Sequence, residues 1–443
     1  MILSRFCTSR LTAQRQLEAA AVQLRRVALF HSTPQPFLRS SHIQQASTSE
    51  IQESIFAPLR INNPPDLTDV RYVHRAILRG DKLDPRSSIE PPPAQRRALI
   101  VAPFYLNLRV NNDHMPETMC DARKIHQSLL KQGYQAKDIR ILSEGFHDQF
   151  NGYSDPTRAN ILTSLDWLVD GANSTDHRFF HFSGHGERFI SKKGEGKRTR
   201  VALKNVNTMT VEAESDDTER YIREEPPLRV EAQTTPQSQL TYYKEAIRVL
   251  PRYNAETRDE QEWIEDWELN TVFSQLPEGC TLTSVLDCCA SGRMINNTIK
   301  AGGYGFRGGS NEPTKRSMSS VPAAAEGSLV EISMPEKLPE VEAAMDRITA
   351  NAYTWAACHQ RQQAAPHPHS TGSGHFTWVF TQELDLAPRE MSIEELFNKV
   401  SERMQREALP GNNQYAQLRV SMAERTHWQV KLRDMMERPV SVI

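Results

Sequence analysis

The feature that most constrains the fold is an alternation of short apolar runs with helix-like segments between residues 97 and 182. Apolar runs of strand length occupy residues 97–104, 139–142 and 179–182. Between them, residues 117–131 and 157–169 repeat apolar side chains at helical intervals. This order of strands and helices builds right-handed crossover units. The sequence therefore predicts an α/β fold, a mostly parallel sheet with helices on both faces.

The same pattern returns in the second half of the chain. Its predicted helices cover residues 262–276, 376–384 and 393–407, and its predicted strands cover residues 281–286, 353–357 and 417–422. Charged residues, Thr and Pro dominate residues 191–240, which predicts a solvated insertion with a hairpin near residues 201–209. Gly, Ser and Pro enrichment makes residues 301–345 a predicted linker.

The N-terminal segment has a composition of its own. Residues 1–50 contain six arginines, no lysine and two acids, which is typical of a mitochondrial presequence but equally of a disordered basic tail. Residues 51–95 hold several prolines among polar residues and predict a poorly helical lead-in. The chain is expected in the cytoplasm, with mitochondrial import as the alternative.

Composition excludes several classes of protein. A formal net charge of -2 over 443 residues does not suit a nucleic-acid binder that relies on bulk charge. Six cysteines, none in a C-x-x-C pair, do not make a disulfide scaffold. There is no apolar run of membrane-spanning length, so no membrane association is expected.

Two glycine-flanked segments directly follow predicted strands. They are residues 181–186, HFSGHG, and residues 287–292, DCCASG. The carboxyl ends of parallel strands are where ligands bind in open α/β sheets. A histidine and a cysteine there, each near a glycine that admits a substrate backbone, would suit a thiol nucleophile and its base.

These two motifs resemble the H-Y/F-S-G-H-G and D-S-C-H-S-G motifs of the metacaspases, caspase-like cysteine proteases of fungi, plants and protists. The resemblance covers about residues 96–422 and includes residues 120–122, 156–168, 264–270, 276–287, 355–358, 374–377 and 414–418. It implies a caspase-like domain over residues 96–432. Within it, residues 96–300, with the insertion 191–240, resemble the large subunit and residues 346–432 resemble the small subunit.

The resemblance also implies roles for individual residues. His185 would be the general base and Cys289 the nucleophile, since a thiolate attacks where a thiol does not. The N–H groups of Gly186 and Cys289 would stabilise the oxyanion. Asp121 and Asp287 match the two carboxylates that select Arg or Lys before the cut bond, so the expected partners are peptide and protein substrates with those residues. A monomer is implied, and self-cleavage would fall at Arg307, Lys315 or Arg316.

The motifs depart from the family pattern at several positions. Cys288 stands where serine is usual and Ala290 where histidine is usual. Of the family's calcium ligands only Asp266 is matched, because Trp267, Asn296 and residues 243–245 replace the expected acids. Hard cations need several carboxylate oxygens, so the calcium set is incomplete and no cofactor is assigned.

Several alternatives remain beside these roles. Cys288 is expected to be a silent replacement and His181 a structural histidine, and Asp121 could instead belong to the first turn of a surface helix. His367 and His369 form a poor zinc site as two loop histidines. A catalytically impaired caspase-like scaffold is the competing function. A nucleotide-dependent enzyme is disfavoured because no phosphate-binding glycine motif is present.

Overall fold

The computed structural model describes residues 65–83, 94–105, 114–190, 197–200, 240–251, 262–295, 299–303, 348–358, 364–367, 372–408, 414–423 and 428–443. All of them belong to the compact unit that spans residues 52–443. The presequence-like residues 1–50, the predicted hairpin at 201–209, and the proposed cleavage residues Arg307, Lys315 and Arg316 lie outside the described residues.

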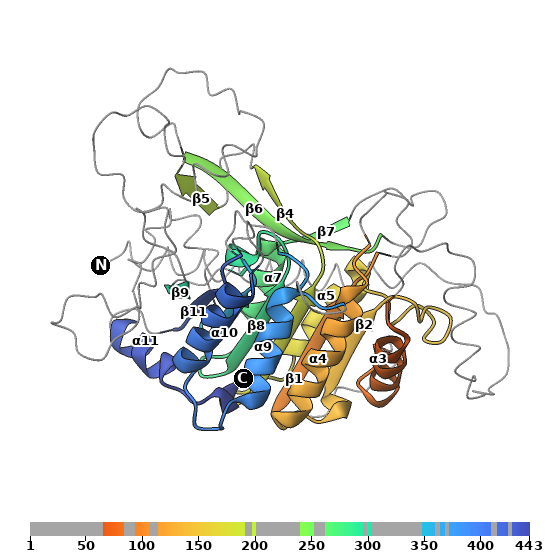
Figure 1. Ribbon diagram of the computed structural model, residues 1–443, viewed down its shortest axis with the longest axis horizontal. Coiled ribbons are helices and arrows are strands. Elements are labelled where there is room, and N and C mark those ends of the chain that lie inside the picture. The colour runs from red at the N-terminus through yellow and green to blue at the C-terminus, as the bar shows by residue number, and fades with distance from the viewer. Residues whose placement is uncertain are drawn as a thin grey trace, which may run out of the picture. The chain divides into compact units, whose positions relative to one another are not determined.

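A seven-stranded sheet forms the centre of the fold, in the order β2-β1-β3-β8-β10-β11-β9 (Figure 1). The first five strands in this order run parallel to one another, and β11 pairs antiparallel with both β10 and β9. The strands are β1 (Arg96–Ala102), β2 (Ile139–Ser143), β3 (His177–Ser183), β8 (Thr281–Asp287), β9 (Ile299–Gly303), β10 (Asn351–Ala356) and β11 (Gln417–Ser421). The predicted mostly parallel sheet is therefore confirmed.

The parallel strands are buried because both of their faces are covered. Along β1, Ala98, Ile100 and Ala102 face one hydrophobic core, while Leu99 and Val101 face the other. Side chains of successive strand residues point to opposite faces, so a strand covered on both sides becomes a continuous apolar run. This is why residues 97–104 lack the alternation of a half-exposed strand.

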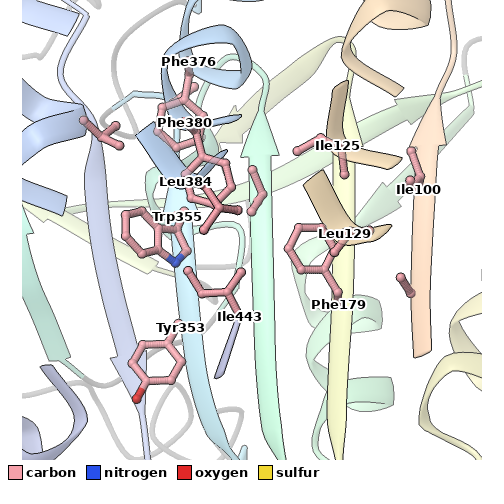
Figure 2. Close-up of a cluster of buried hydrophobic side chains, with 14 of the residues drawn as sticks. Ile100, Ile125, Leu129, Phe179, Tyr353, Trp355, Phe376, Phe380, Leu384 and Ile443 are labelled. Carbon is pink, nitrogen blue, oxygen red and sulfur yellow. The ribbon is translucent and has the colours of Figure 1, made fainter. Parts of the chain in front are cut away.

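The first face of the sheet is covered by α3 (Leu67–Arg79), α4 (Glu117–Lys131), α9 (His375–Leu386), α10 (Ile393–Glu407) and α11 (Trp428–Met436). Figure 2 shows the aromatic centre of this core, where Trp355 of β10 lies below Phe380 and Phe376 of α9. The rings of Trp355 and Phe380 are 5.1 Å apart between centroids and meet nearly edge to face. Ile125 and Leu129 of α4 pack in the same core beside β3.

The second face is covered by α5 (Arg158–Val169) and α7 (Asp266–Phe273), which pack against each other and against the sheet. Thr157 caps α5 by accepting a hydrogen bond from the N–H of Asn160. The prediction of helices on both faces is thus confirmed. Short 3-10 helices complete the described elements, η1 (Ala136–Asp138), η3 (Ser291–Arg293) and η5 (Val440–Val442).

A second, antiparallel sheet continues directly from the carboxyl end of β3. It consists of β4 (Gly186–Ile190), β5 (Lys197–Arg200), β6 (Leu240–Val249) and β7 (Glu262–Glu265), with β6 pairing to each of the other three (Figure 1). Strand β5 lies inside the predicted solvated insertion. Strand β7 replaces the first turn of the helix predicted over residues 262–276, because Trp263 and Ile264 pair with β6.

The prediction of a poorly helical lead-in before residue 96 is wrong for residues 67–79, which form α3. Asp66 caps this helix, accepting a hydrogen bond from the N–H of Thr68, and Val70, Val73 and Ile77 are buried at helical spacing. The core also extends past the predicted end at residue 432. Met435 and Ile443 are fully buried, and Arg96 donates to the carbonyl of Ile443 at 3.1 Å.

Among the described residues, no helix combines the length and apolarity that a membrane crossing requires. The cysteines of the described segments, Cys120, Cys280, Cys288, Cys289 and Cys358, are all free thiols. The described part of the fold therefore contains no disulfide.

Candidate active site

The two glycine-flanked motifs meet because β3 and β8 are neighbouring parallel strands. Their register pairs Ser183 with Asp287 at the carboxyl ends, and His185 and Cys289 each follow two residues later. The N–H of Gly184 donates to the carbonyl of Asp287 at 3.2 Å, which continues the pairing past the strand ends. The sheet register alone therefore brings the histidine and the cysteine to the same edge.

Gly186 brings the two motifs into backbone contact. A Cβ atom added at this position would overlap the carbonyl oxygen of Cys289 and lie 3.1 Å from the Sγ of Cys288. Only glycine leaves room for this approach. The segment that follows His185 is therefore packed directly on the segment that carries Cys289.

Tyr105 positions His185. The Tyr105 hydroxyl accepts a hydrogen bond from the N–H of His185 at 2.8 Å and donates one to the carbonyl of Arg248 at 3.0 Å. The rings of Tyr105 and His185 lie 4.8 Å apart between centroids. Tyr105 has a positive φ of 59°, a conformation that costs free energy in a bulky residue. The Glu144 carboxylate holds this turn by accepting the N–H groups of Phe104 and Tyr105.

Cys289 lies on a sharp turn between β8 and η3. Ala290, the next residue, adopts the left-handed conformation with a φ of 54°, and the cysteine itself is partly exposed. Burial raises the pKa of the Cys289 thiol above its ordinary value of 9.0, a hydrogen bond from the Ala364 backbone partly offsets this, and the charges of Glu187 and Asp287 add to the rise. The thiol is therefore protonated at neutral pH and needs a base to become a nucleophile.

Cys288 is buried and cannot act as a second accessible nucleophile in this conformation. Its residue is 0% exposed, and burial raises the pKa of its thiol well above the ordinary value. The Cys358 thiol donates to the Cys288 carbonyl at 3.3 Å, so the backbone beside Cys289 is held by a residue that follows β10. That Cys288 is a silent replacement stays a prediction.

Asp121 and Asp287 come together at the N-terminus of α9. A Cβ atom added at Gly374 would overlap the Asp287 carboxylate and lie 3.1 Å from Asp121 Oδ2. Asp121 accepts hydrogen bonds from Ser183 Oγ and Ser373 Oγ, both at 2.6 Å, and from the N–H of Gly374 at 3.0 Å. The two acids therefore flank the same glycine.

Asp287 is held by the first turn of α9, where it accepts the N–H of Thr377 at 2.8 Å. Burial raises the pKa of both carboxyl groups, and the charge of Asp287 raises that of Asp121 further. Asp121 is 0% exposed, so the alternative that it lies on the first turn of a surface helix is wrong. The helix dipole and these donors favour the charged carboxylates and so offset part of the effect of burial.

His181 is a buried structural residue, as expected. Its Nδ1 hydrogen-bonds to the carbonyl of Val285 at 3.0 Å, and burial lowers its pKa to about 3. The imidazole is therefore neutral and ties β3 to β8.

The calcium ligands expected for the family do not fit the described residues. Asp266 turns its carboxylate to the N–H groups of Trp267, at 2.8 Å, and Glu245, at 3.5 Å. Lys244 lies nearby and pairs with Glu265 at 3.2 Å, which brings a positive charge to the same strand ends. Trp267 supplies no side-chain oxygen, and Asn296 lies outside the described residues. A calcium ion would find too few carboxylate oxygens here.

Sequence reasoning missed the residues that support the acids and the histidine. Tyr105, Ser373, Gly374 and Thr377 are distant in sequence from the residues they contact. Residues 374–377 had two sequence signals, the family resemblance and their position at a helix start, where N–H groups are free. Neither signal paired them with Asp121 or Asp287. For Tyr105 no sequence signal was available.

Several known proteins are similar to this chain. Residues 96–223 match the model of the metacaspase, peptidase C14 domain. Metacaspase-1 of Mycosarcoma maydis is 28% identical over 236 residues, covering 53% of this chain and 44% of the relative. Metacaspase-1 of Coccidioides immitis is 23% identical over 326 residues, covering 70% and 59%. A crystal structure of a Geobacter sulfurreducens protein covers 78% of this chain and 98% of its own, with 11% identity and a TM-score of 0.41.

The parallel sheet, with a histidine and a cysteine at the ends of two neighbouring strands, defines a caspase-like α/β domain. Within that class, residues 96–223 match the metacaspase, peptidase C14 domain, and the chain is similar to fungal metacaspases. The chain spans less than two thirds of the length of these relatives.

Proposed function

We propose that this chain is a cysteine endopeptidase that cleaves peptide bonds after Arg or Lys, with Cys289 as nucleophile and His185 as base. The observation that carries the proposal is the contact of Gly186 with the Cys289 backbone at the ends of two register-paired strands. That contact leaves the two functional segments next to each other at the edge of the sheet where α/β proteins bind ligands.

His185 would take the thiol proton as Cys289 attacks the substrate carbonyl carbon. A C–S bond forms, the carbonyl oxygen becomes an oxyanion, and the imidazolium then returns the proton to the leaving amine as the C–N bond breaks. Water attacks the resulting thioester as His185 accepts one of its protons. The C–S bond then breaks, the acid product leaves, and the imidazolium returns its proton to the Cys289 thiolate. The raised pKa of the Cys289 thiol makes this base necessary at neutral pH.

The N–H groups of Gly186 and Cys289 are the proposed oxyanion donors. They belong to the two backbone segments that touch each other, so an oxygen bound between them would lie beside the nucleophile. Donors fixed in this way are already oriented before charge develops, and removal of one such donor typically costs about 100- to 1000-fold in rate.

Asp121 and Asp287 are the proposed basis of the Arg or Lys preference. Two carboxylates are the expected complement of a guanidinium or ammonium group. Both acids are almost fully buried and bound by local donors, so their negative charge acts through a site of low dielectric constant. An incoming cation would also favour the charged form of the pair, against the effect of burial.

The test is hydrolysis of fluorogenic peptides that end in Arg, Lys, citrulline or Asp before the cut bond. Citrulline has nearly the shape of Arg without its charge. We expect cleavage of the Arg and Lys peptides only, complete loss in Cys289→Ala and His185→Ala, and retained cleavage in Cys288→Ser. Asp121→Asn should reduce the preference for Arg over citrulline by more than about tenfold.

Each part of the proposal can fail separately. Cleavage that survives in Cys289→Ala would reject the nucleophile, and equal cleavage of Arg and citrulline peptides would reject the role of the acids. A folded protein that cleaves none of the peptides, and whose Cys289 does not react with an Arg-based electrophile, would favour the scaffold function.

A further inference from the structure

Two buried histidines and a glutamate lie close together at the N-terminus of α9. His367 Nε2 lies 3.1 Å from Glu407 Oε2, and the rings of His367 and His375 lie 5.2 Å apart between centroids. One potential ligand atom from each residue falls within 4.8 Å of the other two. His375 is 0% and His367 8% exposed, while the Glu407 side chain is 22% exposed and leaves a way in from solvent.

The backbone fixes both histidines before any ligand binds. The N–H of His367 donates to the carbonyl of Ser373 at 2.9 Å, and the N–H of His375 donates to the carbonyl of Ala365 at 3.0 Å. These two bonds flank an antiparallel bridge between Pro366 and Gly374. The two imidazoles are thus carried on short paired segments rather than on independent loops.

The carboxylate is oriented as well. Arg403 donates to Glu407 Oε1 at 2.8 Å and to Glu383 Oε1 at 2.9 Å, which leaves Glu407 Oε2 directed at His367. An outer partner that holds a ligating carboxylate in this way is a common part of metal sites and strengthens ion binding.

We propose that His367, His375 and Glu407 form a binding site for a divalent transition-metal ion of the Zn²⁺ class. Two imidazoles and one carboxylate are a known protein ligand set for zinc, with a fourth position open to water. Ligand atoms about 2.0 Å from a tetrahedral ion stand about 3.3 Å apart. The 3.1 Å pair already meets that spacing, and one ligand atom from each of the three residues lies within 4.8 Å of the others.

The three ligands include no sulfur atom, which narrows the class of ion that they would bind. Imidazole favours Zn²⁺ and its neighbours, while hard ions such as Ca²⁺ need six or more oxygen ligands. This cluster is separate from the calcium position of the family, which the Asp266 region would occupy. It replaces the pair of His367 and His369 considered from sequence, of which His369 lies outside the described residues.

The site lies between two segments that contact the catalytic region. Gly374, next to His375, donates to Asp121, and the backbone of Ala364, three residues before His367, hydrogen-bonds to the Cys289 thiol. A bound ion would therefore clamp the segment beside the nucleophile to the helix that holds the acid pair. Ion binding itself does not depend on the proposed peptidase activity.

The experiment uses the full chain with Cys289→Ala, so that the active-site thiol cannot bind the ion. After treatment with a chelator, the protein is titrated with Zn²⁺, Co²⁺ and Ca²⁺ while thermal stability and the visible spectrum of Co²⁺ are recorded. We expect one equivalent of Zn²⁺ or Co²⁺ to bind, with no response to Ca²⁺. At a hundredfold excess over the Kd, Zn²⁺ should raise Tm by roughly 5 °C.

Two variants and a control make the test specific. Glu407→Gln and His367→Asn should each weaken binding at least about tenfold and remove the Tm shift. Glu383→Gln changes the other carboxylate bound to Arg403 and should leave binding intact. Absence of stoichiometric binding, equal binding in all variants, or a thiolate charge-transfer band in the Co²⁺ spectrum would overturn the proposal. Tm values without metal show whether each variant is folded.

Discussion

Tyr105 contacts His185 in two ways, through a 2.8 Å hydrogen bond from the histidine N–H to its hydroxyl and through ring packing at 4.8 Å. The same hydroxyl donates to the carbonyl of Arg248. One buried phenol therefore ties the backbone that carries the proposed base to strand β6. Gly184 is required for this arrangement, since a Cβ atom there would lie 2.7 Å from the hydroxyl.

Tyr105→Phe should reduce catalysis without weakening substrate binding. The change keeps the ring but leaves the N–H of His185 and the carbonyl of Arg248 without this partner, which costs about 1–3 kcal/mol of stability. We expect kcat to fall about tenfold with KM within about twofold, since an imprecisely held base slows proton transfer. The measurement is steady-state kinetics on an Arg peptide. A rise in KM with unchanged kcat would assign Tyr105 to substrate binding instead.

Alkylation of Cys289 should become faster as the pH rises beyond 9. Burial is the main cause of the raised pKa of this thiol, and the nearby charge of Glu187 contributes. Because only the thiolate reacts, the alkylation rate follows deprotonation. Glu187→Gln should move the midpoint of the rate profile to lower pH, while Glu278→Gln, a change of an exposed acid at another site, should not. A midpoint near neutrality would mean that a stable thiolate–imidazolium pair exists before substrate binds.

Stability should depend on pH through the buried acid pair. Burial and the neighbouring Asp287 raise the pKa of Asp121 from 3.8 to about 7. The folded state therefore binds more protons than the unfolded state between these values, and this contribution to stability decreases as the pH rises through that window. In Asp121→Asn, the decrease in the free energy of unfolding between pH 5 and pH 8 should be smaller by on the order of 2 kcal/mol.

Urea unfolding at the two pH values measures this difference. Asp148→Asn, which changes an exposed acid, is the matched control and should leave the pH dependence unchanged. An Asp121→Asn protein with the same slope as the original chain would show that the pair does not exchange protons in this range.

Helix α3 should contribute to the stability of the caspase-like domain although sequence analysis placed it outside that domain. Ile77 is 4% exposed and packs in the core, whereas its neighbour Leu78 is 47% exposed. Ile77→Ala should cost roughly 2–5 kcal/mol of unfolding free energy. Leu78→Ala should cost less than about 0.5 kcal/mol, as a surface change does. Equal effects in denaturant unfolding would mean that α3 does not dock as described.

Most of the central sheet could be predicted because its parallel strands are apolar on both faces and its helices keep a clear period. Two local features could not be predicted from the sequence. The prolines and charges around α3 outweighed its four buried apolar positions, and the 262–265 segment has a pattern that suits a helix as well as a strand. In the second case pairing with β6, a tertiary interaction, decided the structure.

The candidate site, like the fold, could be predicted only in part. His185 and Cys289 could be found because local motifs carry them, and the predicted strands placed them at one sheet edge. The supporting contacts could not be found, since Tyr105 lies 80 residues before His185 and Ser373 lies 252 residues after Asp121. Glu407 was missed as a partner of His367 for the same reason, at a separation of 40 residues.

The edge strand β9 has a consequence for a chain cut between residues 304 and 347. Strands β8 and β9 precede that segment, and they pair with β10 and β11, which follow it. The two pieces of a nicked chain would share one continuous ladder of backbone hydrogen bonds and one hydrophobic core. Cutting there would create two new chain ends and yield a two-chain particle that separates only on denaturation.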